Sequence, residues 1–253
     1  MASQIRYFIG NWKMFGIPAS IKIIDRINNF LVRDKKNNKK YKIIIAPPHT
    51  LLQDFSNKFK TKKISICAQN CFQKGDFGAY TGFVSAFMIK KIGINHIIIG
   101  HSENRASGEN DVIIKEKIFT ALKNNLNIIF CIGENKNEKR KKLTLRVLKK
   151  QITNVLKKNY NLKKIIIAYE PVWSIGTGKV PKLRELQKTA FLLKKFLKSR
   201  FGGKYNFKLL YGGSVDNKSI RNFKLIKELD GFLIGGASKS SKKFIDIIRN
   251  FYK

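Results

Sequence analysis

Short apolar runs recur along the chain, and segments with helical spacing separate them. The eight runs lie near Tyr7–Gly10, Ile43–Ala46, Ile64–Ala68, His96–Ile99, Ile128–Cys131, Ile165–Ala168, Phe207–Leu210 and Gly231–Ile234. Most are continuously apolar rather than alternating, as is typical of strands that are covered on both faces. Between the sixth and seventh runs, Leu186, Ala190, Leu193 and Leu197 follow the three- and four-residue spacing of an amphipathic helix.

This alternation of eight strands with helices predicts an α/β fold. Over 253 residues it favours a closed parallel (β/α)₈ barrel with outer helices, in which residues 1–253 form a single domain. A doubly wound open sheet is the alternative, but no G-x-G-x-x-G motif follows the first run. The basic segment 33–40 reads as a loop rather than as a boundary between domains.

The charge of the chain is extreme, at +36 with 52 Lys and Arg against 16 Asp and Glu. Three interpretations compete: a nucleic-acid or membrane partner, a field that attracts a small anionic substrate, or a general lysine-rich composition without a partner. The lysines crowd loops and helix backs, and no aromatic-rich RNA-binding signature accompanies them. We therefore expect neither a specific nucleic-acid partner nor a membrane partner.

Other features of the composition point to a cytoplasmic protein without a metal. The odd count of three cysteines argues against a disulfide framework. Cys67 and Cys71 have no second pair or nearby histidine to complete a zinc site, so we expect reduced thiols. Arg6 interrupts the start of the chain, which lacks the apolar core of a signal peptide, and no run of about 18 apolar residues suits a membrane span.

Chemically active residues follow the predicted strands. They are Asn11 and Lys13 after the first strand, His101 after the fourth, Glu170 after the sixth, Gly212-Gly213-Ser214 after the seventh and Gly235-Gly236 after the eighth. In a barrel, the carboxyl ends of the strands meet on one face, which carries the active site. Glycine-rich turns after the last two strands are suited to holding a phosphate with backbone N–H groups.

Glu170 has the setting of a general base on a carbon acid. It ends an apolar run, and the segment after it is stiff at Pro171–Trp173 and flexible at Gly176 and Gly178, as a closing lid requires. A helix that begins after His101 would place this imidazole at the positive helix end, which disfavours its charged form. We interpret His49 and His96 as satisfied core or capping residues.

The chain resembles the triosephosphate isomerase family over nearly its whole length. The motifs that carry the resemblance are NWKMFG at 11–16, CAQN at 67–70, GAYTG at 78–82, IGHSE at 99–103, CIGE at 131–134, AYEPVWSIGTGKV at 168–180, YGGSV at 211–215 and DGFLIGGAS at 230–238. The resemblance implies a TIM barrel that interconverts D-glyceraldehyde 3-phosphate and dihydroxyacetone phosphate through an enediol, in glycolysis and gluconeogenesis. It also implies that no metal or organic cofactor is needed, because the reaction only moves protons.

The resemblance assigns roles to individual residues. Glu170 is the implied base, His101 the neutral electrophile, Lys13 the cation that stabilises the enediolate, and Asn11 a substrate ligand. The implied phosphate ligands are Gly176, Ser214, Gly235 and Gly236. Around them, Glu103 positions the lysine, Glu134 partners Trp173 of the lid, and Tyr211 meets the closed lid. A homodimer is implied, in which the Gly75–Ser85 loop docks near Asn11 and Lys13 of its partner through Thr81.

The sequence departs from the family pattern at three places. Phe83 and Asn104 replace a glutamate and an arginine that form an ion pair near the subunit contact, so neither charge is left alone, and we expect Phe83 to make an apolar contact. Pro181 replaces an alanine whose N–H bonds the tyrosine equivalent to Tyr211 when the lid shuts, and proline has no N–H. The segment 106–109 is one residue tighter than usual.

Three rival functions stay open at this point. A polyanion binder would explain the charge but not the ordered strand-end residues. An inactive scaffold is prompted by the departures, but Asn11, Lys13, His101 and Glu170 all remain. Another phosphate-binding barrel enzyme would explain the glycine turns but not the segment around Glu170.

Overall fold

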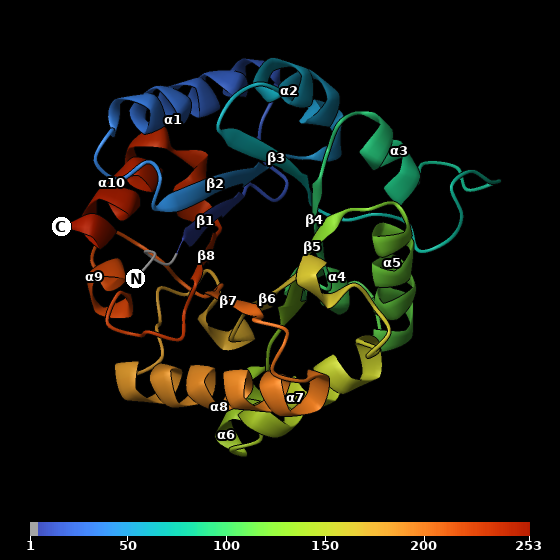
Figure 1. The fold of residues 1–253 in the computed structure, drawn as a ribbon, viewed down its shortest axis with the longest axis vertical. Coiled ribbons are helices and arrows are strands. Elements are labelled where there is room, and N and C mark those ends of the chain that lie inside the picture. The colour runs from blue at the N-terminus through green and yellow to red at the C-terminus, as the bar shows by residue number, and fades with distance from the viewer. Residues whose placement is uncertain (1–4) are drawn as a thin grey trace.

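Eight parallel strands close into one barrel in the computed structural model, which describes residues 5–253 (Figure 1). The strands are β1 (Arg6–Asn11), β2 (Tyr41–Ala46), β3 (Ile64–Ala68), β4 (His96–Ile99), β5 (Asn127–Ile132), β6 (Ile165–Tyr169), β7 (Lys208–Tyr211) and β8 (Gly231–Ile234). Each strand pairs with its neighbours in chain order, and β8 closes on β1. The predicted barrel and its eight apolar runs are therefore confirmed.

Helices surround the barrel on its outer side (Figure 1). They are α1 (Ile21–Arg33), α2 (Leu52–Phe59), α3 (Ala86–Lys91), α4 (Ser102–Ala106), α5 (Asp111–Lys123), α6 (Lys136–Arg140), α7 (Thr144–Val155), α8 (Leu183–Phe201), α9 (Ser219–Phe223) and α10 (Ser241–Tyr252). None of the helices in residues 5–253 has both the length and the apolar composition needed to cross a bilayer. Residues 1–4, on which part of the signal-peptide expectation falls, lie outside the described residues.

The apolar residues form two cores, one on each face of the barrel wall. The inner core fills the barrel with alternate strand residues: Ile9, Ile44, Ala46, Cys67, Ile98, Ile129, Cys131, Ala168, Leu210 and Leu233. The outer core lies between the strands and the helices, and it includes Leu186, Ala190, Leu193 and Leu197 of α8. Because both faces are buried, the strands can be continuously apolar, which explains the pattern seen in the sequence.

Glycines let the strand ends approach one another at the top of the barrel. Tyr169, the last residue of β6, pairs with Ile132 at the end of β5 and with Tyr211 at the end of β7. The residues that follow β5, β6 and β7 therefore lie at one level. A Cβ added to Gly133 would lie 1.8 Å from the backbone oxygen of Glu170. No side chain fits there, so the position of Glu170 depends on a glycine in the neighbouring strand end.

The three cysteines are buried free thiols, as expected. Cys67 and Cys131 belong to the inner core. Cys71 lies in the outer core near Lys117.

Candidate active site

A cleft of about 370 Å³ opens at the carboxyl ends of the strands. It brings together all eight residues expected to contact a ligand: Asn11, Lys13, His101, Glu170, Gly176, Ser214, Gly235 and Gly236. The four other predicted site residues, Glu103, Glu134, Trp173 and Tyr211, lie behind these residues and bind them or the lid. Residues separated by more than 200 positions in the chain therefore line one small volume.

Glu170 and His101 face each other inside this cleft. The Nε2 atom of His101 lies 3.3 Å from Oε1 of Glu170. Both side chains are almost completely buried, with residue exposures of 4% for His101 and 2% for Glu170. The carboxylate and the imidazole are thus close enough to act on neighbouring atoms of one small substrate.

Burial raises the pKa of Glu170 above its ordinary value. His101, the Cys131 thiol, the backbone N–H of Ser102 and Lys13 oppose this shift, but burial is the largest cause. A carboxylate with a raised pKa is a stronger base than an exposed one. Its environment therefore suits it to removing a proton from carbon.

The backbone fixes the proton on the far nitrogen of His101. His101 caps the N-terminus of α4, and its Nδ1 accepts a hydrogen bond from the backbone N–H of Glu103 at 3.2 Å. An imidazole nitrogen that accepts a hydrogen bond carries no proton, so the proton of the neutral ring is on Nε2. That N–H points to the cleft, where it can donate to a substrate oxygen.

Lys13 is held in an unusual backbone conformation. Its φ angle is 58°, in the left-handed region, and its carbonyl accepts a hydrogen bond from Nε2 of Gln69 at 2.9 Å. Its N–H donates to Oδ1 of Asn11, and its Nζ atom lies 2.7 Å from Oε1 of Glu103. Glu103 thus holds the lysine as expected, whereas the support from Gln69 was missed because glutamine in CAQN has no distinctive chemistry in the sequence.

Away from Glu170 and His101, much of the cleft is lined by the backbone of glycine residues, among them Gly235 and Gly236. A Cβ added to Gly236 would meet no atom within 4 Å, so the space beside this residue is open to a ligand. Lys239, in the 3₁₀ turn Gly236–Lys239, also lines the cleft and brings a cation that the sequence analysis did not select. Its place three residues after the Gly235-Gly236 pair was the available signal, but it was hidden among many lysines.

The lid is tied to the barrel through Trp173. Its Nε1 donates to Oε1 of Glu134 at 2.9 Å, and the hydroxyl of Tyr169 donates to the same oxygen at 3.2 Å. The side chain of Glu134 is fully buried, burial raises its pKa, and its Oε2 has no hydrogen-bond partner among the described residues. The expected contact between Glu134 and Trp173 is present in this structure.

Ser174 connects the lid to the seventh strand end, and the sequence analysis did not select it. Its buried hydroxyl donates to the carbonyl of Lys179 at 2.6 Å and lies 3.2 Å from the hydroxyl of Tyr211. Its carbonyl accepts a hydrogen bond from the Ser214 hydroxyl at 2.6 Å. In this arrangement the hydroxyl of Ser214, a residue that lines the cleft, is bonded to the lid.

Comparison with known proteins agrees with this geometry. The family model described as triosephosphate isomerase matches residues 6–251. The triosephosphate isomerase of Yarrowia lipolytica is 38% identical over 96% of this chain and 98% of that protein, and the one of Debaryomyces hansenii is 39% identical over 99% of both. The crystal structure of triosephosphate isomerase from Bartonella henselae is similar with a TM-score of 0.88, at 33% identity over 98% of this chain and 99% of that chain. With its barrel, its cleft and these matches over almost its full length, the chain belongs to the triosephosphate isomerase family.

Proposed function

We propose that this chain is a triose-phosphate isomerase that interconverts D-glyceraldehyde 3-phosphate and dihydroxyacetone phosphate. The observation that carries the proposal is the 3.3 Å approach of His101 Nε2 to Glu170 Oε1 at one end of a cleft whose other end is lined by glycine turns. A base, a hydrogen-bond donor and an anion site in this order match a short substrate with a carbonyl at one end and a phosphate at the other.

In the proposed reaction, Glu170 removes a proton from the carbon next to the carbonyl and returns it to the neighbouring carbon. The N–H on Nε2 of His101 donates to the carbonyl oxygen, so the negative charge that develops on this oxygen in the transition state is stabilised. The same imidazole then moves protons between the two oxygens of the enediol. Only protons change place, so the reaction requires neither a metal nor an organic cofactor.

Lys13 and Asn11 complete the oxygen end of the proposed site. The ammonium of Lys13 adds a positive charge beside the enediolate and the phosphate, and Glu103 keeps it in place at 2.7 Å. Asn11, which is 5% exposed, would hold the substrate oxygens from the end of β1. The cation at this site acts in a low dielectric, where its effect on developing charge is strong.

The phosphate is assigned to Gly176 of the lid, to Ser214 and to Gly235 and Gly236. Lid closure would bring the N–H of Gly176 to the phosphate and release Ser214 from Ser174. A closed lid also excludes water, and this protects an enediolate that can otherwise eliminate its phosphate.

The role of the base is tested with Glu170→Asp. The shorter side chain withdraws the carboxylate from the substrate carbon, and a displacement of about 1 Å in such a site lowers the rate by about 10²-fold. We expect a drop of this size in kcat, measured in a coupled assay with either triose phosphate.

Glu116→Asp is the matched control, because Glu116 is an exposed residue of α5. Its rate should equal that of the wild type. Equal rates for wild type and Glu170→Asp would contradict the proposed role of Glu170, and an inactive wild type would favour the scaffold interpretation.

Pro181 removes one hydrogen bond from the proposed closed lid. In the family pattern the residue at this position gives its N–H to the tyrosine equivalent to Tyr211, and here Tyr211 instead lies next to the Ser174 hydroxyl. Pro181→Ala restores the donor, and a neutral hydrogen bond contributes about 0.5–1.5 kcal/mol net. We expect a phosphorylated analogue of the enediolate to bind about two- to thirteenfold more tightly, as measured by calorimetry.

Pro18→Ala, on an exposed proline outside the lid and outside the cleft lining, serves as the control and should leave the affinity unchanged. If Pro181→Ala and Pro18→Ala bind the analogue equally, the missing donor does not limit closure.

We also propose that the chain acts as a homodimer, as one domain over residues 1–253, in the cytoplasm where the triose phosphates are processed. The Gly75–Ser85 loop supports the dimer. It belongs to the segment between β3 and α3 that projects away from the barrel in Figure 1. Phe77 and Phe83 are 76% and 59% exposed, and the ring of Phe83 packs on Phe72 at 4.4 Å. Exposed aromatic side chains on a projecting loop are suited to burial against a second copy.

Phe83→Ala tests this interface. Because Phe83 stands where the family pattern has a charged residue, its apolar contact should replace the missing ion pair. We expect the dimer to dissociate at protein concentrations at which the wild type stays dimeric, as measured by sedimentation at high dilution.

The control is Phe191→Ala, which removes a similarly exposed ring (54%) from α8. An unchanged dimer mass for Phe83→Ala across the dilution series would exclude an important contact at this position.

A further inference from the structure

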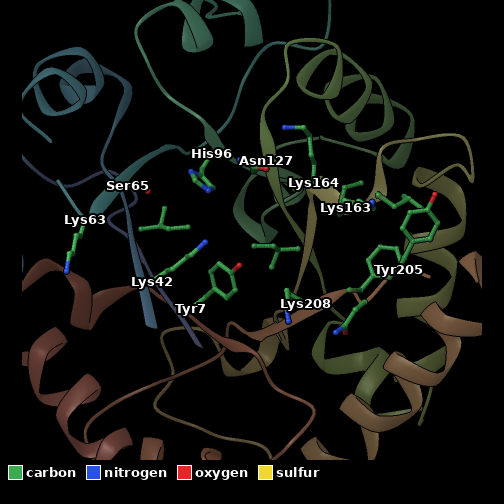
Figure 2. Close-up of a pocket in the computed structure, with 16 residues that line it drawn as sticks. Tyr7, Lys42, Lys63, Ser65, His96, Asn127, Lys163, Lys164, Tyr205 and Lys208 are labelled. Atoms are coloured by element: carbon green, nitrogen blue, oxygen red, sulfur yellow. The ribbon is translucent and has the colours of Figure 1, made fainter. Parts of the chain in front are cut away.

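A second cavity lies at the opposite end of the barrel from the active-site cleft. It has a volume of about 520 Å³, and residues at the beginning of the strands line it (Figure 2). Tyr7, Lys42, Ser65, His96, Asn127 and Lys208 are each the first or second residue of their strand. We call this cavity the basal pocket.

The basal pocket is strongly basic. Its lining includes five lysines: Lys42, Lys63, Lys163, Lys164 and Lys208. No aspartate or glutamate of the described residues lines it. Lys208 lies 3.4 Å from Asp230, and Lys164 donates to the carbonyl of Asn125. Within residues 5–253, Lys42, Lys63 and Lys163 have no carboxylate at ion-pair distance. Their like charges repel one another unless an anion separates them.

His96 shows a further unsatisfied group in the same place. We expected a satisfied core histidine, and this expectation is wrong, because the buried Nδ1 atom of His96 has no hydrogen-bond partner among the described residues. Burial and then Lys42, Lys164 and Lys90 lower the pKa of His96 to about 4. The ring is therefore neutral at neutral pH, and a buried polar atom without a partner is destabilising.

Hydrogen-bond donors other than lysine complete the lining. The hydroxyls of Tyr7 and Ser65 belong to it. In Figure 2, Lys42 and Lys63 come from one side of the pocket, and Lys163, Lys164 and Lys208 come from the other. Cations on two sides suit an elongated anion better than a single small one. The volume is in the range of pockets that hold small molecules.

We propose that the basal pocket binds a small molecule that carries two or more linked phosphate groups. Lysine binds phosphate as a point charge with three donors, so several lysines can hold an oligophosphate without a fixed geometry. The site is independent of the isomerase reaction, because no residue is shared between the two cavities. The remaining surface charge would bind polyanions without saturation at a defined site, and this is the competing outcome.

The test follows the histidine resonances by NMR while inorganic tripolyphosphate is added at constant ionic strength. The chain has three histidines, and each reports on a different place: His96 on the basal pocket, His101 on the active-site cleft, and His49 on neither. We expect the His96 resonances to shift and saturate. Sulfate at the same ionic strength should shift them at least tenfold less effectively, because it has only one anionic group.

The double variant Lys42→Gln/Lys163→Gln removes two exposed pocket lysines, and we expect it to weaken binding at His96 at least tenfold. The double variant Lys22→Gln/Lys188→Gln is its charge-matched control, with exposed lysines of α1 and α8 outside the pocket, and it should bind as the wild type does. Thermal unfolding without ligand checks that both double variants fold. If Lys42→Gln/Lys163→Gln does not fold, the single variant Lys163→Gln replaces it.

Three results would overturn the proposal. They are His96 resonances that do not move, equal weakening in the pocket and control variants, and a response confined to His101. The last would place the anion in the active-site cleft alone. Because these readouts do not use turnover, they are distinct from any failure of the proposed isomerase activity.

Discussion

The hydrogen bond from the Glu103 backbone to Nδ1 of His101 determines what the cleft can do. It leaves the proton of the neutral ring on Nε2, 3.3 Å from the carboxylate of Glu170. The carboxylate of Glu170 and this N–H therefore face each other in the same cleft. The barrel makes this possible, because its parallel strands bring the carboxyl ends of β4 and β6 to one face.

Burial, a glycine in the neighbouring strand end and the lid together determine the surroundings of Glu170 and His101. Burial raises the pKa of Glu170 and makes its carboxylate more basic, while Gly133 allows its backbone to approach β5. The lid is tied back through Trp173 and Ser174, and Ser174 also occupies Ser214. These contacts hold one short segment against the barrel, so a movement of this segment would also free the Ser214 hydroxyl.

The sequence predicted the barrel and the cleft well, because both depend on patterns along the chain. Continuous apolar runs such as Ile165–Ala168 indicate buried strands, and Glu170, two residues after this run, is therefore expected at a strand end. The features that were missed depend on which way a side chain points. Ser174 gains its importance from Tyr211 and Ser214, which are distant in sequence, and His96 was expected to be satisfied because a single histidine gives no sign of the lysines around it. Lys239 was missed because one lysine among so many carries little information.

The tautomer of His101 is the most direct measure of this account. Nitrogen-15 NMR of the ligand-free protein at about pH 8, with labelled histidine, distinguishes a protonated ring nitrogen from one that accepts a hydrogen bond. The account predicts a single form of His101 with its proton on Nε2 and with Nδ1 as an acceptor. A proton on Nδ1, or a mixture of the two forms, would contradict it.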